Sequence, residues 1–372
     1  MSDYFGKDVF KLGFGLMRLP KNRDGSIDVA QTGEMVDRFL AHGGTYFDTA
    51  YVYEGSEEAA GKALVERHPR ESYTLATKLN AGIPNLDEAA AKQQLYTSLE
   101  RTGAGYFDYY LLHALGRRNR EKYEDFHLWD FMEEQKAKGV LRHIGFSFHS
   151  DPYLLDELLT DHPGVDFVQL QLNYADWENP GIASRANYEV ARKHGKSVVV
   201  MEPVKGGALA DPIPRVKAVF DGAGSSASYA SWAIRYAASL DGIITVLSGM
   251  SSLEQMDDNL SYMKNFQPLS EQELEVIRRA QEALNEDKSI PCTACRYCTG
   301  GCPKNIPIPE IFTVQNRQAV YPGWDKGKSD YSVATANKGK ASECIGCGQC
   351  ENACPQQLHI IELLKDCAAA LE

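Results

Sequence analysis

Residues 73–112 read YTLATKLNAGIPNLDEAAAKQQLYTSLERTGAGYFDYYLL and contain one complete structural unit. Tyr73–Thr77 and Asp108–Leu112, at its two ends, are short apolar runs of strand length, while Leu86–Arg101 carries apolar residues at helical spacing. Gly103 follows the helical run, as glycines that end helices do. A strand, a helix and a second strand in this order predict a βαβ unit with parallel strands.

The same alternation runs on both sides of this unit, with Gly139 and Gly195 again placed after helical runs. It predicts an α/β fold, a closed (β/α)8 TIM barrel. An open doubly wound sheet is the alternative, but it favours a glycine-rich fingerprint that Gly13-Phe14-Gly15 does not complete. The expected strands are Lys11–Gly15, Thr45–Asp48, Tyr73–Thr77, Asp108–Leu112, Arg142–Ser147, Phe167–Gln171, Ser197–Met201 and Gly242–Leu247, and the expected helices include Glu57–Glu66, Leu86–Arg101, Tyr123–Lys138 and Ile182–His194.

Composition describes a globular chain with an acidic balance. Apolar residues make up 43% of the 372 residues and charged residues 24%, as in ordinary globular proteins. No apolar stretch approaches the roughly 20 residues of a membrane span, so we expect no membrane contact. The net charge of −12 disfavours a nucleic-acid partner, whose phosphates it would repel. The opening residues show no secretory signal, so the expected location is the cytoplasm.

Cysteine placement divides the chain in two. All nine cysteines occur from Cys292 onward, after a long cysteine-free part that does not resemble a disulfide-stapled secreted protein. A charged helical run precedes them, and Ser270 with Glu273 has the pattern of a capping box at its start. We therefore expect a barrel domain over residues 1–288 and a cysteine-bearing domain over residues 289–372.

Polar residues stand at or just after the ends of several expected strands, where barrel enzymes place their chemistry. In chain order they are Asp48, Tyr53, Lys78, His113, Ser147 and Gln169. Each of them alone is more often part of a structural ion pair or a satisfied core residue. A complete set on successive strand ends favours a proton-transfer site over independent structural roles.

The run Phe47-Asp48-Thr49-Ala50-Tyr51-Val52-Tyr53-Glu54 resembles the signature of the aldo-keto reductase family. Lys78 and His113 stand where that family has its remaining catalytic residues, so the resemblance implies a tetrad completed by Asp48 and Tyr53. It also implies a (β/α)8 barrel, a nicotinamide cofactor, NAD(P)H, and a small carbonyl or alcohol as substrate.

The residue types of this tetrad suit carbonyl reduction, which needs hydride on carbon and a proton on oxygen. A tyrosine with a pKa of about 10 is a poor acid–base catalyst at neutral pH, but a neighbouring ammonium lowers that pKa. Lys78 is expected to do this for Tyr53, while Asp48 keeps Lys78 charged and oriented. His113 is expected to hydrogen-bond the substrate oxygen and polarise it.

The same resemblance implies a nicotinamide site with less complete matches. Ser147 and Gln169 stand where the family holds the carboxamide, although Phe148 replaces the usual Asn. Met201 replaces the usual aromatic residue against the nicotinamide ring, and a thioether can also lie against a ring. The adenosine-phosphate loop is expected at Ser248, Gly249, Ser251, Gln255, Asp258 and Asn259.

This loop lacks the basic residue that holds the 2′-phosphate in many family members, since Met250 and Gln255 are uncharged. NADH and NADPH therefore both stay open, with NADPH slightly preferred. Lys205, after the seventh strand, is a candidate phosphate contact, and a solvated surface lysine is the alternative.

The cysteines form two copies of one spacing. The runs are Cys292-x2-Cys295-x2-Cys298-x3-Cys302-Pro303 and Cys344-x2-Cys347-x2-Cys350-x3-Cys354-Pro355. Each is the ferredoxin run that binds a 4Fe–4S cluster, so two 4Fe–4S clusters are predicted. Zinc also takes four thiolates, but zinc sites require neither the third cysteine nor the Cys-Pro ending. Disulfides are disfavoured in a chain without an export signal.

The fourth cysteine of each run is expected to bind the cluster of the other run, as in two-cluster ferredoxins. The long insert between the runs and the helical segments Pro309–Ala319 and His359–Leu371 resemble the α-helical two-cluster ferredoxin domains of anaerobic oxidoreductases. Cys367 is left over and is expected to pack as a small apolar residue. The predicted ligand sets are Cys292, Cys295, Cys298 and Cys354 for one cluster and Cys344, Cys347, Cys350 and Cys302 for the other.

The leading hypothesis is an oxidoreductase that interconverts a carbonyl and an alcohol with nicotinamide hydride. Hydride carries two electrons and each cluster carries one, and no flavin motif is present. The clusters are therefore expected to serve an external electron-transfer partner, redox sensing or the folding of their own domain. The alternative is a non-catalytic nucleotide-sensing or electron-relay module, which Phe148 and Met201 favour and the Tyr53–Lys78 pair disfavours.

Overall fold

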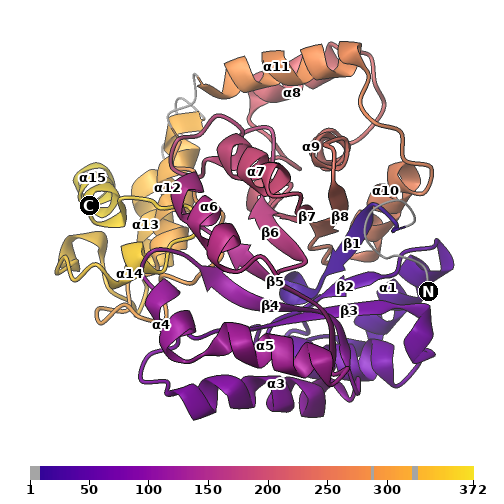
Figure 1. The fold of residues 1–372 in the computed structure, drawn as a ribbon. Coiled ribbons are helices and arrows are strands. Elements are labelled where there is room, and N and C mark those ends of the chain that lie inside the picture. Colours follow the sequence, from indigo (N-terminus) through magenta and orange to yellow (C-terminus); the bar gives the residue numbers. More distant parts are fainter. Residues whose placement is uncertain (1–8, 286–288, 321–325) are drawn as a thin grey trace. The chain divides into compact units, whose positions relative to one another are not determined.

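The computed structural model describes residues 9–285, 289–320 and 326–372. Its strands form a closed barrel in which neighbouring strands are parallel and β8 pairs with β1 (Figure 1). The expected (β/α)8 barrel is confirmed, and every expected strand overlaps an observed one. The strands are β1 Leu12–Gly15, β2 Tyr46–Asp48, β3 Thr74–Leu79, β4 Phe107–Leu115, β5 Leu141–Phe148, β6 Phe167–Gln171, β7 Ser197–Met201 and β8 Ile243–Ser248.

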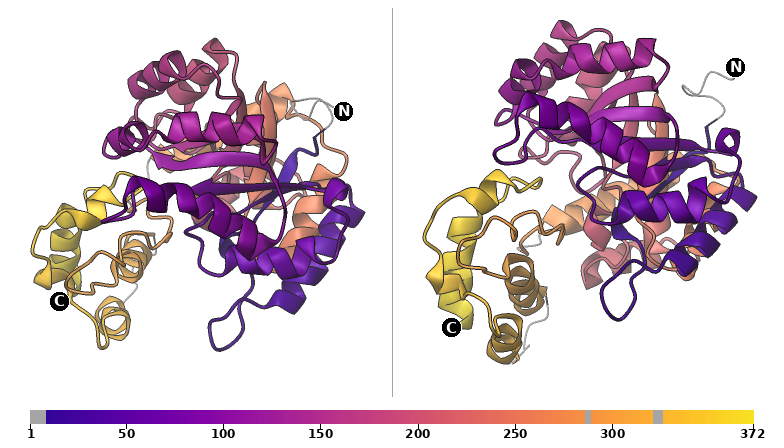
Figure 2. Two further views of the ribbon diagram at one scale, coloured as in Figure 1. Left: turned by 60° about the horizontal axis from the view of Figure 1, so that its bottom comes forward. Right: turned by 90° about the horizontal axis from the view of Figure 1, so that it is seen from below.

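Helices alternate with these strands along the chain. They are α1 Val29–Ala41, α2 Ser56–Ala60, α3 Glu88–Thr102, α4 Arg120–Asp125, α5 Leu128–Ala137, α6 Pro152–Asp161, α7 Ser184–Lys193, α8 Pro214–Asp221, α9 Tyr229–Ala238, α10 Leu253–Met263 and α11 Glu271–Asn285. Helices such as α3, α5 and α6 lie on the outside of the strands (Figures 1 and 2). The strands therefore face helices on one side and one another across the barrel on the other.

Two expected helices differ from the structure in detail. The segment Tyr123–Lys138 is not one helix but two, because His127 takes a left-handed φ of 49° between α4 and α5. The segment Glu57–Glu66 is not one α-helix, since α2 continues into a π-helical turn at Gly61–Val65. Hydrophobic spacing alone shows neither interruption, because both keep the apolar residues facing the barrel.

The expected helix ends are confirmed. Gly103, Gly139 and Gly195 have φ values of 66°, 76° and 69°, the left-handed conformation that glycine adopts without a steric penalty. At the start of α11, Ser270 N donates to Glu273 Oε2 at 2.8 Å and Glu273 N donates to Ser270 Oγ at 3.3 Å. These two reciprocal bonds form the predicted capping box.

Side chains fill the barrel interior. Tyr46, Tyr109 and Phe167 are buried, and the ring centroid of Tyr109 lies 4.8 Å from that of Tyr46 and 5.3 Å from that of Phe167. A larger apolar cluster fills the space between the strands and their helices. A packed interior leaves the C-terminal ends of the strands as the place for a site.

The chain divides into two compact units. One comprises the residues up to Val204 with Ala230–Leu274, and the other comprises Lys205–Tyr229 with Glu275–Glu372. The segment after β7 thus groups with the cysteine-bearing part of the chain. The boundary expected between residues 288 and 289 stays a prediction.

The cysteine-bearing unit has a small core of its own. Cys367 is fully buried in this core, which confirms its expected packing role. The expected helices Pro309–Ala319 and His359–Leu371 are confirmed as α12 and α15. The helices after the first cysteine run are α12 Ile308–Val320, α13 Gly327–Ala334, α14 Gln349–Asn352 and α15 Ile360–Leu371.

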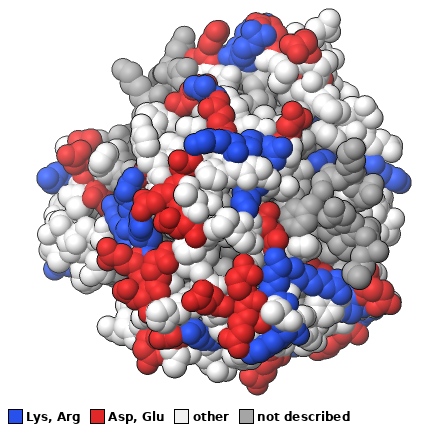
Figure 3. Space-filling view, in the orientation of Figure 1, with Lys and Arg blue, Asp and Glu red and all other residues white. Residues whose placement is uncertain are grey.

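Acidic and basic side chains are interspersed on the face shown in Figure 3. Within the three described segments, no helix is both long and apolar enough to cross a bilayer. The expectation that the chain binds no nucleic acid stays a prediction.

Candidate active site and candidate cluster ligands

A buried ion pair joins the ends of β2 and β3. Lys78 Nζ donates to Asp48 Oδ1 at 2.6 Å and to the carbonyl of Thr49 at 2.7 Å. Only 1% of Lys78 and 4% of Asp48 is exposed. Because β2 and β3 are neighbouring parallel strands, their ends bring these two residues together although they are 30 positions apart.

Tyr53 and His113 lie beside this ion pair. Lys78 Nζ is 5.2 Å from the centroid of the Tyr53 ring, and the Tyr53 and His113 rings are 5.6 Å apart and nearly perpendicular. Tyr53 is half-buried, whereas His113 is buried. The structure thus brings the four predicted catalytic residues together, with the tyrosine as the most accessible of them.

Burial shapes the charge states of this group. It lowers the pKa of Lys78, while the Asp48 carboxylate opposes that change and favours the ammonium form. Burial also lowers the pKa of His113 well below its usual value, and the nearby charge of Lys78 adds to this. His113 is therefore a neutral imidazole at physiological pH. Its Nδ1 has no hydrogen-bond partner among the described residues.

Tyr123 supports the site in a way that the sequence did not reveal. Its hydroxyl donates to the carbonyl of His113 and accepts from Ala81 N at 3.3 Å. A tyrosine from α4 thereby ties the end of β4 to the residues that follow β3. In the sequence, Tyr123 is only an apolar position of a helical run, so no signal there distinguishes it from a core residue.

The predicted carboxamide contacts lie on neighbouring strands. Ser147 and Gln169 are directly paired in the register of β5 and β6, and both are buried. Ser147 Oγ accepts from Ala114 N at 2.7 Å, which leaves its hydroxyl proton free to donate elsewhere. Gln169 Oε1 has no partner among the described residues. An unpaired buried amide oxygen of this kind fits a ligand amide. Met201 is half-buried at the end of β7.

The predicted adenosine-phosphate loop is held by its own hydrogen bonds. Asn259 Nδ2 donates to Ser248 Oγ at 2.7 Å, and Ser251 N donates to Gln255 Oε1 at 2.7 Å. Gly249 lies close to Arg18, since a Cβ there would be 3.6 Å from the Arg18 side chain. Most of the predicted side chains therefore shape the loop.

Asp258 of this loop and Lys205 after β7 are the remaining predicted nucleotide contacts. The described hydrogen bonds of Asp258 include one from Ser261 Oγ to its backbone carbonyl at 2.6 Å. Lys205 is only 9% exposed, so its interpretation as a solvated surface lysine is wrong.

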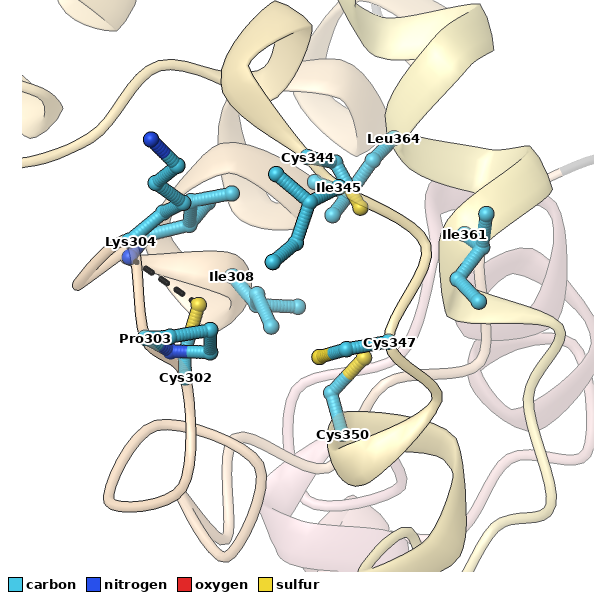
Figure 4. A pocket seen from close by; sticks show the side chains of 11 residues that line it. Cys302, Pro303, Lys304, Ile308, Cys344, Ile345, Cys347, Cys350, Ile361 and Leu364 are labelled. Carbon is cyan, nitrogen blue, oxygen red and sulfur yellow. Dashed lines mark hydrogen bonds between the residues drawn. The ribbon is translucent and has the colours of Figure 1, made fainter.

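Four cysteines line one pocket of the second unit, with a volume of about 320 Å³ that is partly open to solvent. Cys302 comes from the first run, whereas Cys344, Cys347 and Cys350 come from the second (Figure 4). Cys347 is exposed and Cys350 is buried. The rest of the lining consists of Pro303, Lys304, Ile306, Ile308, Ile345, Ile361 and Leu364. The four cysteines are those of one predicted ligand set.

The other predicted set also gathers. Burial raises the pKa of Cys298 to about 12, and the nearby Cys295, Cys292 and Cys354 raise it further. Burial likewise raises the pKa of Cys292 to about 11, with Cys295 and Cys354 among its neighbours. Cys354 thus lies near the first run although it belongs to the second, and all nine cysteines are free of disulfides.

The two cysteine loops have left-handed residues at the same two positions. Ala294 and Arg296 have φ values of 50° and 67°, and Gly346 and Gly348, at the same positions of the second run, have 67° and 77°. Left-handed residues on both sides of the middle cysteine turn the chain so that it can wrap around a bound group. Thiolate donors on a repeated wrapping loop, around a mainly apolar pocket, fit an iron–sulfur cluster.

A closed parallel barrel with an Asp, Tyr, Lys and His set gathered at its strand ends has the architecture of a barrel enzyme. The model of the aldo/keto reductase family matches residues 11–282, and the chain belongs to that family. The model of a 4Fe-4S dicluster domain matches residues 291–359, which include both cysteine runs.

Curated aldo-keto reductases match part of the chain. The chain is 29% identical to an aldo-keto reductase of Mycolicibacterium vanbaalenii over 238 residues, 63% of this chain and 79% of that protein. It is 28% identical to aldo-keto reductase str7 of Strobilurus tenacellus over 212 residues, 54% of this chain. The chain spans only 60% of the length of the Strobilurus protein.

Solved structures share the fold. The holo form of an aldo-keto reductase from Bacillus halodurans has a TM-score of 0.59 and 26% identity, covering 73% of this chain and 92% of that one. A Klebsiella pneumoniae aldo/keto reductase in complex with NADP and acetate has the same TM-score of 0.59 at 22% identity, covering 73% of this chain and 91% of that one.

Proposed function

We propose that the barrel interconverts a small carbonyl compound and its alcohol with a nicotinamide cofactor. One observation carries this proposal: the buried Lys78 ammonium, paired with Asp48 at 2.6 Å, lies 5.2 Å from the ring of the accessible Tyr53. A buried ammonium beside an accessible tyrosine favours the phenolate form of that tyrosine and so suits it to proton transfer.

The four residues divide the work of moving one proton. The bound nicotinamide supplies hydride to the carbonyl carbon, or accepts it from the alcohol. Tyr53 donates its proton to the carbonyl oxygen, because Lys78 stabilises the phenolate that remains. Neutral His113 holds the same oxygen by a hydrogen bond, and Asp48 keeps Lys78 in place and charged. In alcohol oxidation Tyr53 takes the proton back.

The residues near the strand ends fit a nicotinamide. Gln169 Oε1 is a free acceptor and Ser147 keeps a free hydroxyl proton, a pair that complements a carboxamide. We propose NADPH as the preferred form over NADH, and this preference rests on the family resemblance alone. The loop adds no support for it, because Gln255 is neutral and already bonded to Ser251. Dissociation constants for both nucleotides, measured by fluorescence titration, test this preference.

We propose that the cysteine-bearing part holds two 4Fe–4S clusters on interleaved ligand sets. The support is the pocket that combines Cys302 with Cys344, Cys347 and Cys350, together with the matching loop conformations. Their proposed role is one-electron exchange with an external partner, or redox sensing. A cytoplasmic location suits such clusters, because the cytoplasm is kept reducing.

Tyr53→Phe tests the barrel chemistry. The variant keeps the ring and loses the transferable proton, so carbonyl reduction over a panel of aldehydes and ketones should fall by about 100-fold or more. Unchanged turnover in Tyr53→Phe would contradict the proposed roles. Micromolar NAD(P)H binding with no turnover of any carbonyl by the wild type would instead favour the non-catalytic module.

Anaerobic purification with iron and sulfide counting tests the clusters. We expect about eight irons and eight sulfides per chain. Nicotinamide titration of the same sample, followed by absorbance and EPR, then shows whether reduced nucleotide ever reduces the clusters. A count of zinc without sulfide would overturn the cluster proposal.

A further inference from the structure

One arginine of α3 contacts the loop that carries Tyr53 at residues before and after that tyrosine. Arg101 Nη1 donates to the carbonyl of Tyr51 at 3.1 Å and to Glu57 Oε2 at 3.1 Å. Its guanidinium also lies over the Tyr51 ring, 4.6 Å from the centroid. The contacts therefore fall two residues before Tyr53 and four residues after it.

Glu57 also connects these contacts of Arg101 to the strand that bears Lys78. The Glu57 side chain is fully buried, and its Oε1 accepts from Thr77 Oγ1 at 2.6 Å. Thr77 is the residue before Lys78 on β3. One buried carboxylate thus connects the Tyr53 loop, α3 and the end of β3, with both of its oxygens hydrogen-bonded.

We propose that Glu57 and Arg101 are positioning residues for the Tyr53–Lys78 pair. Arg101 fixes the loop so that the Tyr53 hydroxyl points to one place, and Glu57, bonded to the residue before Lys78, supplies a second buried negative charge in the same region. This inference rests on the proposed carbonyl chemistry and deepens it.

The surroundings of the two carboxylates make the charge argument specific. Asp48 is the nearer partner of Lys78, and the charge of Glu57 raises the pKa of Lys78 in addition. Negative charges beside a proton-sharing pair make every proton of that pair harder to remove. The titratable or charged groups around Lys78 and Glu57 are Asp48, Tyr53, His113, Arg101, Glu58, Tyr51 and Tyr110.

If the Glu57–Arg101 ion pair were purely structural, breaking it would lower stability without changing the pH profile of activity. Breaking a buried pair destabilises a fold wherever it lies, so a loss of stability does not separate the two roles. Asp108 offers a matched control, because it is a buried carboxylate bonded to Arg70 at 2.6 Å and Arg142 at 2.9 Å. It stands near the start of β4, at the opposite end of that strand from His113.

The test is the pH profile of kcat/KM for carbonyl reduction by the anaerobic holoprotein. In wild type, we expect activity to fall on the basic side, where the Tyr53–Lys78 pair loses a proton. Glu57→Gln keeps the shape and can still accept from Thr77, but it removes the charge. Its basic limb should move to lower pH by roughly one unit. Asp108→Asn should lose stability without moving that limb.

Arg101→Ala is a second variant. It should disturb folding less than a change at Glu57, because 31% of the Arg101 side chain is exposed. Arg101→Ala removes a positive charge near the Tyr53–Lys78 pair and leaves the Glu57 carboxylate without its counter-ion, so the limb should move to higher pH, opposite to Glu57→Gln. The double variant of Glu57→Gln with Arg101→Ala removes one charge of each sign, so its limb should lie between those of the two single variants.

The outcomes separate this inference from the function on which it rests. Full carbonyl reduction by Tyr53→Phe removes the proposed function itself. An inactive Tyr53→Phe with an unmoved basic limb in folded Glu57→Gln and Arg101→Ala removes only the positioning role. Opposite shifts in the two variants, with none in Asp108→Asn, support it. Circular dichroism and an unchanged iron content establish that each variant is folded.

Discussion

Replacing Asp48 with asparagine tests whether Lys78 is a buried cation that depends on one partner. The change keeps the size of the side chain and removes the charge that Lys78 contacts at 2.6 Å. Lys78 is 1% exposed and keeps only the carbonyl of Thr49, at 2.7 Å, as a described partner. In the folded Asp48→Asn variant, the Lys78 ammonium therefore has no counter-charge in direct contact.

These contacts give the loss in the free energy of unfolding that we expect for Asp48→Asn. That loss cannot exceed the free energy needed to deprotonate Lys78. Removing one partner of a buried ion pair costs about 3–5 kcal/mol. Lys78 can escape by losing its proton, which at pH 7 costs at most about 4.6 kcal/mol for a group whose unfolded pKa is about 10.4. At pH 9 the same limit is only about 1.9 kcal/mol. Since the folded pKa is depressed, the cost is largest at low pH and disappears as pH rises toward the unfolded pKa.

The assay is anaerobic thermal unfolding followed by tryptophan fluorescence at one scan rate. The Tm deficit of Asp48→Asn relative to wild type should be several degrees at pH 7, at roughly 2–4 °C per kcal/mol, and smaller by at least about a third at pH 9. The double variant Asp48→Asn with Lys78→Met has no lysine to titrate, so its deficit should be equal at both pH values. A deficit of Asp48→Asn that does not change with pH would refute the reasoning.

Two further predictions concern the bound groups. In the first, Cys302→Ala should leave the same residual cluster EPR spectrum as Cys347→Ala, and Cys354→Ala should leave the same spectrum as Cys295→Ala. The iron content should fall by about one to four per chain in each variant. A spectrum of Cys302→Ala that matches Cys295→Ala would contradict the interleaved ligand sets. In the second, Gln169→Ala should raise the dissociation constant of the nicotinamide nucleotide about 5- to 10-fold through one lost hydrogen bond, and unchanged binding would argue against this residue.

The fold could be predicted because every level of the sequence agreed on it. Strand-length apolar runs, helical runs and terminal glycines all pointed to repeating βα units, and Gly103 takes the left-handed conformation that its position required. The interruptions were missed for a physical reason. His127 takes a positive φ, which is uncommon for non-glycine residues, and no glycine marks this position in the sequence.

The candidate site was predictable where strand ends supplied it and not where tertiary contacts did. Asp48, Lys78 and His113 could be found because consecutive parallel strands end on the same side. Glu57 and Arg101 are 44 positions apart on two helices, and each has ordinary surface-type chemistry in the sequence. Burial turns that pair into a clamp, and burial is a property of the folded chain alone.

The departure at Phe148 bears less on catalysis than the sequence suggests. Ser147 pairs with Gln169 and Phe148 with Leu170 in the register of β5 and β6, so the two residues of each strand face opposite sides. Phe148 and Leu170 both belong to the apolar cluster between strands and helices, and Phe148 is 2% exposed. An aromatic residue there packs the core on the side away from Ser147 and Gln169. The non-catalytic hypothesis therefore keeps only Met201 as its support, and a half-buried thioether at a strand end is compatible with a nicotinamide ring.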